Sequence, residues 1–140
     1  MKQDKKGFTL VEIMIVVSII VLLAALAIPN LLRSRIGANE ASAVSSLKTL
    51  SAAAETYFPA QTPGGYPPNL AALIGANPPY IDSILGGGNK SGYSFTWGGG
   101  GNTYSVVAAP QTANVTGVRS FFIDQSGVIR VGTSANGTPI

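Results

Sequence analysis

The sequence predicts an α+β fold in which a long N-terminal helix packs on a C-terminal antiparallel sheet of about four strands. Three observations lead to this prediction. Residues 8–28 are almost entirely apolar, residues 30–58 repeat apolar side chains at helical spacing, and Tyr93, Phe95 and Trp97 alternate with polar residues. The first two patterns are typical of helices, and the third is typical of a strand with one buried face.

The first part of the predicted helix has the length of a membrane span. Phe8–Ile28 contains 21 residues and one charge, that of Glu12. With a rise of about 1.5 Å per residue, this stretch extends about 31 Å, close to the hydrocarbon thickness of a bilayer. A carboxylate at the bilayer centre costs about 2.5–3.5 kcal/mol and less near the edge, so Glu12 needs a specific role. At the other end, Pro29 lacks an N–H and clashes with the carbonyl of Ala25, which predicts a kink or local unwinding.

The helical pattern continues from residue 30 to residue 58 with a narrower apolar stripe. Its members, spaced by three, four or seven residues, are Leu32, Ile36, Ala43, Leu47, Leu50, Ala54 and Tyr57. This spacing places them on one helical face, which should pack against a head. The charged residues that largely avoid this face are Arg33, Glu40, Lys48 and Glu55. Pro59 is expected to end the helix.

The remaining residues predict a connection followed by a small sheet. Residues 59–92 are rich in Pro and Gly, which break regular structure. Asn69 is suited to cap a short helix over Leu70–Ile74, closed by Gly75, and a second helical turn is expected over Tyr80–Leu85. The expected strands are Tyr93–Trp97, Thr103–Ala109, Val118–Asp124 and Val128–Val131, with Gly98–Asn102 as a flexible hairpin loop.

Composition argues against an enzyme, a metal centre and a nucleic-acid-binding protein. The chain has no cysteine and no histidine, which excludes disulfides and removes the commonest general base. Much of the net charge of +3 lies in residues 1–6, and no basic stripe follows. Gly86–Gly92 lacks the glycine spacing of a phosphate-binding loop, and Asp82 and Asp124 cannot supply the oxygens of a calcium site. No catalytic, cofactor-binding or metal-binding residue is assigned.

The N-terminal residues carry a family resemblance. Gly7-Phe8-Thr9-Leu10-Val11-Glu12, after a short basic leader, closely resembles the processing site of type IV pilins and type II secretion pseudopilins, and the likeness continues to Pro29-Asn30. The resemblance implies that a membrane aspartyl prepilin peptidase cuts between Gly7 and Phe8 and methylates the new amine of Phe8. It also implies that Glu12 pairs with the Phe8 amine of a neighbouring subunit, so that an unpaired carboxylate penalises the wrong register.

The resemblance further implies an organisation, a location and partners. The expected segments are a leader (1–7), a transmembrane and assembly helix (8–29), an amphipathic helix of a pilin-like head (30–58), a connecting region (59–92), and a sheet with a C-terminal tail (93–140). The precursor is expected in a bacterial inner membrane with its N-terminus in the cytoplasm, although Arg33 and Arg35 on the other side leave orientation undecided by charge alone. Its expected partners are membrane lipid, the peptidase, the assembly machinery and, in an extracellular filament or a periplasmic pseudopilus, copies of itself.

Three alternatives stay open from the residues alone. The chain could be a type II secretion pseudopilin rather than a pilin. It could be a membrane-anchored binding domain that never polymerises. It could also be a secreted protein, because Ala25-Leu26-Ala27 resembles a signal-peptide cleavage site, although Glu12 lies inside what would be the apolar core of that signal.

Overall fold

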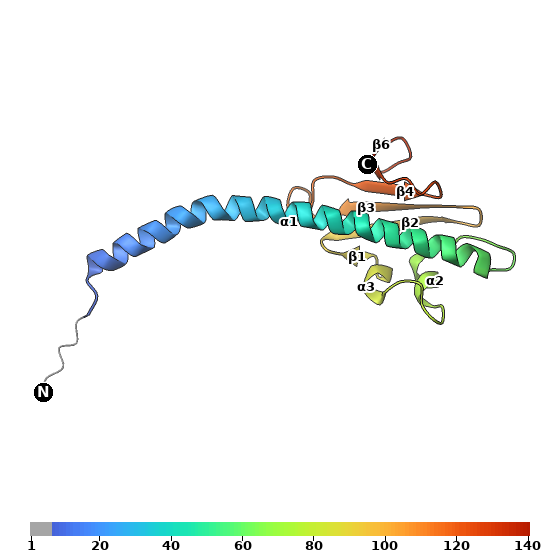
Figure 1. The fold of residues 1–140 in the computed structure, drawn as a ribbon, viewed down its shortest axis with the longest axis horizontal. Coiled ribbons are helices and arrows are strands. Elements are labelled where there is room, and N and C mark those ends of the chain that lie inside the picture. Colours follow the sequence, from blue (N-terminus) through green and yellow to red (C-terminus); the bar gives the residue numbers. More distant parts are fainter. Residues whose placement is uncertain (1–6) are drawn as a thin grey trace, which may run out of the picture. The chain divides into compact units, whose positions relative to one another are not determined.

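The computed structural model describes residues 7–140, so the predicted leader, apart from Gly7, lies outside the described residues. Its main element is helix α1, Leu10–Ala60 (Figure 1). Residue contacts divide the chain into an N-terminal unit that ends at Ser34 and a head that extends from Arg35 to Ile140.

The N-terminal unit exposes its apolar side chains on all sides. Large apolar residues from Phe8 to Leu32 are 44% to 84% exposed. This part of α1 is long and apolar enough to cross a membrane, with a mean hydropathy of 3.0 in its most apolar window. A helix that is apolar on every side requires a surrounding apolar phase, either lipid or other helices. The helix continues without interruption through Pro29, and the kink predicted there stays a prediction.

The head portion of α1 buries the middle of the predicted stripe, whereas Ile36 and Tyr57 are half-buried and Leu32, before the head, is 44% exposed. Ala43, Leu47, Leu50 and Ala54 are at most 1% exposed and face the sheet residues Tyr93, Tyr104, Val106 and Phe121 in one hydrophobic core. The prediction that Glu40 lies away from the buried face was wrong, because its side chain is also buried. The spacing of apolar residues could not predict this burial, because a carboxylate is buried only where other residues supply hydrogen bonds or a counter-charge.

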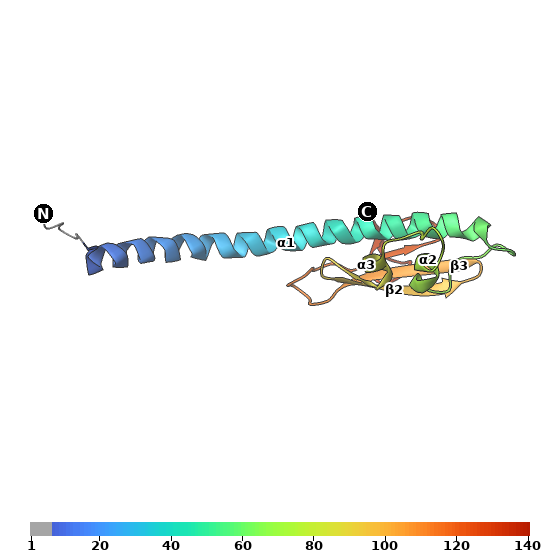
Figure 2. The ribbon, with the colours of Figure 1, turned by 90° about the horizontal axis from the view of Figure 1, so that it is seen from below.

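The sheet is an antiparallel meander in chain order, lying along the head portion of α1 (Figure 2). The described residues contain six strands rather than about four: β1 (Asn89–Lys90), β2 (Tyr93–Gly100), β3 (Thr103–Pro110), β4 (Phe121–Asp124), β5 (Arg130–Val131) and β6 (Thr138–Pro139). The three two-residue strands are too short to show a period of two. Of these three short strands, β5 lies within the predicted strand Val128–Val131, whereas β1 and β6 were not predicted.

Two strand boundaries differ from the prediction for physical reasons. Gly98, Gly99 and Gly100 extend β2 by pairing with Ser105, Tyr104 and Thr103, rather than forming a loop. A Cβ on Gly99 would lie 2.6 Å from the carbonyl oxygen of Thr103, so glycine is what permits this close pairing. Strand β4 begins at Phe121 rather than Val118, because the backbone N–H groups of Val118 and Arg119 bond to Glu40.

The connection contains both predicted helical turns. Helix α2 is Leu70–Ile74, and the Asn69 side chain caps it by accepting a bond from the Ala72 N–H at 3.0 Å. Helix α3 is Ser83–Gly86, slightly later than predicted, because Asp82 caps it through the Leu85 N–H. Both caps satisfy backbone donors that a short helix would otherwise leave unpaired.

Two glycine substitutions should change the stability of the head in opposite directions. A Cβ on Gly117 would lie 2.1 Å from the hydroxyl of the buried Tyr93, which donates a hydrogen bond to the Arg119 carbonyl. Gly117→Ala should therefore lower the free energy of unfolding by about 1–3 kcal/mol. Gly37 is helical with no neighbouring atom within 4 Å, and Gly37→Ala should raise it by about 1 kcal/mol. Thermal unfolding of the full chain in detergent, followed by Trp97 fluorescence, compares the two. Equal melting temperatures would contradict this account of Gly117.

Candidate functional site

The resemblance places the candidate site at the start of α1. Gly7, Phe8 and Thr9 precede the helix without regular structure, and Phe8 is 84% exposed. Among the described residues beyond Phe8, no atom lies within 4 Å of where a Cβ on Gly7 would be. The Gly7–Phe8 peptide bond therefore lies outside the helix, which is compatible with a protease that binds extended substrates.

Thr9 and Glu12 cap the helix reciprocally. The Glu12 Oε2 atom accepts bonds from the Thr9 N–H at 2.8 Å and the Thr9 hydroxyl at 2.9 Å. The Glu12 N–H in turn donates to the Thr9 hydroxyl at 3.2 Å. This Thr-x-x-Glu arrangement is a capping box, which satisfies backbone donors at the start of the helix. The Thr-x-x-Glu spacing is visible in the sequence, but the prediction gave Glu12 only the role of charge pairing.

The capping box leaves part of the Glu12 carboxylate free. Within the described residues, Oε1 has no hydrogen-bond partner. Glu12 shares a surface hollow with Phe8, Ile13, Ile15 and Val16. A cation from outside the chain can therefore approach the carboxylate against an apolar background.

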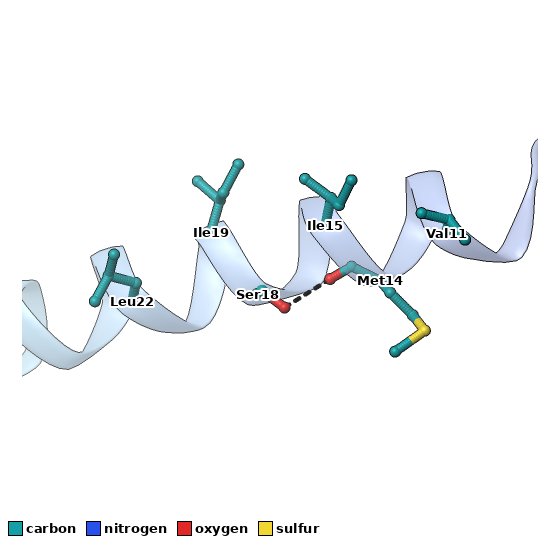
Figure 3. A pocket seen from close by; sticks show the side chains of 6 residues that line it. All are labelled: Val11, Met14, Ile15, Ser18, Ile19 and Leu22. Carbon is teal, nitrogen blue, oxygen red and sulfur yellow. Dashed lines mark hydrogen bonds between the residues drawn. The ribbon is translucent and has the colours of Figure 1, made fainter.

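A second surface hollow lies along the same unit, and its one polar side chain is hydrogen-bonded within the helix. It is lined by Val11, Met14, Ile15, Ser18, Ile19 and Leu22 (Figure 3). The hydroxyl of Ser18 donates to the Met14 carbonyl at 2.7 Å (Figure 3). Because this bond satisfies the hydroxyl within the helix, Ser18 does not oppose burial of this face in lipid or against another helix.

The head contains an ion pair between the buried Glu40 and the half-exposed Arg119 that the sequence did not predict. The Glu40 carboxylate accepts from the N–H groups of Val118 and Arg119 at 3.0 and 3.1 Å, and from Arg119 Nε at 2.8 Å. The Arg119 guanidinium also lies 5.5 Å from the centre of the Phe121 ring. Burial raises the pKa of Glu40, but the hydrogen bonds and the charge of Arg119 outweigh burial and hold the pKa below its usual value. The partners are about 80 residues apart in sequence, so no local signal identifies them.

Of the two aspartates considered for calcium, Asp82 caps α3 and Asp124 stabilises the turn after β4. Hydrogen bonds from the Leu85 N–H and Lys90 lower the pKa of Asp82. Burial raises the pKa of Asp124, but bonds from Ser126 and the charge of Arg130 outweigh it and lower the pKa. Each carboxylate already has a cation, at 3.2 Å for Asp82–Lys90 and 3.7 Å for Asp124–Arg130. The described residues hold no group of three or more potential metal ligands.

An exposed apolar helix with a capped acidic start, joined in sequence to a helix-and-sheet head, defines a pilin-like protein. Residues 2–28 match the family model described as "Prokaryotic N-terminal methylation motif". The chain is 33% identical over 112 residues to the type IV wide pilus major component PilA4 of Thermus thermophilus, covering 77% of this chain and 84% of that protein. The chain therefore belongs to the family of type IV pilins and type II secretion pseudopilins, and its N-terminal motif indicates processing by prepilin peptidase.

Two other relatives match shorter stretches. The type IV major pilin protein PilA of Myxococcus xanthus is 45% identical over 53 residues, which is 38% of this chain and 24% of that protein. The type II secretion system core protein G of Escherichia coli is 35% identical over 95 residues, covering 64% of this chain and 61% of that protein. No solved structure matches the chain significantly.

Proposed function

We propose that this chain is the structural subunit of a type IV pilus or a similar surface filament, polymerised through its N-terminal helix. The observation that carries the proposal is the fully exposed apolar half of α1 with one carboxylate, Glu12, at its start. Lipid covers such a helix before assembly, and copies of the same helix cover it afterwards. The family gives no reason to expect catalysis by this chain.

The carboxylate gives the assembly its register. Cleavage between Gly7 and Phe8 creates an amine that the precursor lacks, and the peptidase methylates it. In the filament, this amine of one subunit pairs with Glu12 of the next, using the carboxylate oxygen that the capping box leaves free. A subunit in the wrong position leaves the carboxylate unpaired in apolar surroundings, which costs several kcal/mol.

The precursor is anchored in a bacterial inner membrane before assembly. Residues 1–7 form the leader, which stays in the cytoplasm, and residues 8–29 span the bilayer. Residues 30–58, 59–92 and 93–140 form the head on the opposite side. The assembly machinery of the inner membrane then moves the subunit from lipid into the filament.

A pseudopilus of a type II secretion system is the second candidate. The likeness to core protein G supports it, whereas the larger share of the Thermus pilus component that aligns supports the pilus. Deleting the gene for this chain in its host distinguishes the pilin from the pseudopilin. Loss of surface filaments identifies a pilin, and loss of protein export with filaments intact identifies a pseudopilin.

Replacing Gly7 tests the processing step that the filament requires. Gly7→Phe should give a membrane precursor that retains its first seven residues and forms no fibres, because a bulky side chain blocks the extended backbone in the protease cleft. Mass spectrometry of the N-terminus and electron microscopy of the cell surface measure the two effects, with Gly37→Ala as the matched control. A fibre-forming Gly7→Phe chain would contradict the proposal. A wild-type N-terminus at Ile28 would instead identify a secreted protein.

A further inference from the structure

Four aromatic rings form a continuous chain inside the head. The Trp97 ring stacks on the Tyr104 ring, with 5.2 Å between the ring centres and 7° between the ring planes. The Tyr104 ring lies 4.7 Å from the ring of Tyr66, which in turn lies 4.7 Å from the ring of Phe58. These distances are in the range of about 4.5–7 Å that is typical of interacting aromatic pairs. An electron can therefore pass from ring to ring without crossing solvent.

The hydrogen-bond partner of each ring decides whether the ring can lose its proton when it is oxidised. The Trp97 indole N–H donates to the carbonyl oxygen of Pro67 at 2.8 Å. The Tyr104 hydroxyl lies 2.9 Å from the hydroxyl of Ser51. A carbonyl oxygen and an alcohol are both very weak bases. Neither partner therefore offers the oxidised ring a good acceptor for its proton.

Tyr66 differs from these two rings because its hydroxyl donates to a carboxylate, that of Glu55, at 2.9 Å. Burial, and then the hydrogen bond and charge of Glu55, raise the pKa of Tyr66 to about 12, so the phenol holds its proton at neutral pH. Oxidation makes a phenol strongly acidic, and its proton then moves along the hydrogen bond to the carboxylate. Loss of this proton stabilises the radical at Tyr66 rather than at the other two rings.

We propose that Trp97, Tyr104 and Tyr66 form an oxidation relay, which carries the loss of one electron from the core of the head to its surface. A one-electron radical oxidant in solution takes an electron from Trp97. Tyr104 replaces that electron and is itself restored by Tyr66. The Tyr66 phenol gives its proton to Glu55. In sum, the oxidant gains one electron, Tyr66 becomes a neutral tyrosyl radical, and the carboxylate becomes a carboxylic acid.

The relay ends at a place where the damage can be repaired. The next ring, Phe58, has no hydroxyl and is much harder to oxidise than a tyrosine, so the radical stays on Tyr66. The hydrogen bond between Tyr66 and Glu55 lies at the surface, whereas the Trp97 N–H is partly buried. A small thiol in solution can therefore restore the phenol by giving one hydrogen atom to the tyrosyl oxygen, and the core tryptophan is preserved.

Pulse radiolysis of the full chain in detergent tests the relay. The azide radical formed in the pulse oxidises tryptophan faster than tyrosine at neutral pH, and Trp97 is the only tryptophan. The absorption of the tryptophan radical should decay as that of a tyrosyl radical appears, at a first-order rate that is independent of protein concentration. Tyr104→Phe should abolish this transfer, because it removes the middle oxidisable ring. Glu55→Gln should slow it about a hundredfold, the low end of what a positioned proton acceptor contributes.

Tyr57→Phe is the matched control for Tyr66→Phe. Tyr57 belongs to α1, and its ring pairs with that of Tyr80 at 5.7 Å; within residues 7–140 neither ring pairs with a ring of the relay. Tyr57→Phe should transfer at the wild-type rate, whereas Tyr66→Phe should lose the tyrosyl signal. Trp97 fluorescence shows whether each variant is folded. Should Tyr66→Phe fail to fold, Glu55→Gln decides the question, because its side chain is exposed.

Three results would overturn the relay. The first is a tryptophan radical that decays only when two molecules meet. The second is an unchanged rate in Tyr66→Phe or in Glu55→Gln. The third is loss of the tyrosyl signal in Tyr57→Phe, which would assign the radical to another tyrosine. None of these results bears on the filament proposal, which depends on cleavage after Gly7 and on fibre formation in cells.

Discussion

Glu12→Ala should be cut and methylated normally but should yield at least about tenfold fewer fibres than the wild type. The substitution removes the only carboxylate in the apolar half of α1, and with it the proposed pairing that favours the correct register. Removing a charge from the apolar segment also favours retention in lipid over extraction. Electron microscopy counts the fibres and so measures assembly. Mass spectrometry of the mature chain shows whether cleavage and methylation took place.

The capping box makes a control for this variant necessary. Glu12→Ala also removes two bonds from Thr9, which costs about 1 kcal/mol of helix stability at the N-terminus. Glu12→Gln keeps a side-chain acceptor for Thr9 but carries no charge, so it should assemble as poorly as Glu12→Ala. Glu55→Ala removes an exposed carboxylate from the same helix and should assemble normally. Fibres at the wild-type level from Glu12→Gln would remove the role given to the charge.

Glu40→Ala should destabilise the head by about 3 kcal/mol, far more than removal of the exposed carboxylate of Glu55. The variant leaves the N–H groups of Val118 and Arg119 without their acceptor and separates Arg119 from its counter-charge. Breaking a buried ion pair costs about 3–5 kcal/mol, and the low end applies because the Arg119 guanidinium is half exposed. Unfolding in detergent followed by Trp97 fluorescence measures the change. Glu55→Ala, which loses one exposed bond to Tyr66, should change the stability by less than about 0.5 kcal/mol.

The same pair gives stability a defined pH dependence. The pKa of Glu40 is lower in the folded chain than its ordinary value, so the folded state prefers the carboxylate. Its contribution is therefore complete above the unfolded pKa of about 4.3 and is lost as the pH falls through the lower folded pKa. The difference in melting temperature between wild type and Glu40→Ala should shrink as the pH is lowered from about 6 to about 3. The contributions of Asp82 and Asp124 to the pH dependence are the same in both chains, so they cancel in the difference. A difference that stays constant with pH would contradict the ionised pair.

Local patterns were sufficient to predict the elements that depend on neighbours in sequence. The apolar run, the Asn69 cap of α2, the alternation of Tyr93, Phe95 and Trp97, and the buried positions from Ala43 to Ala54 are all found as predicted. In each case the physical cause acts within a few residues, through helical or strand periodicity or through a cap. The processing motif is equally local.

The sequence alone therefore determined a membrane-length helix with one acidic residue, an amphipathic continuation and a strand-rich end. Only the tertiary structure decided that Glu40 is buried, that β4 starts after Arg119, that glycines 98–100 pair within β2, and that the connection carrying Val115 and Val118 is held beside the first turns of the head helix. These features depend on partners that folding brings together from distant parts of the chain. The burial of Glu40 and the first residue of β4 both depend on hydrogen bonds from the N–H groups of residues 118 and 119. These donors are distant from Glu40 in sequence, so no local pattern predicts the contact.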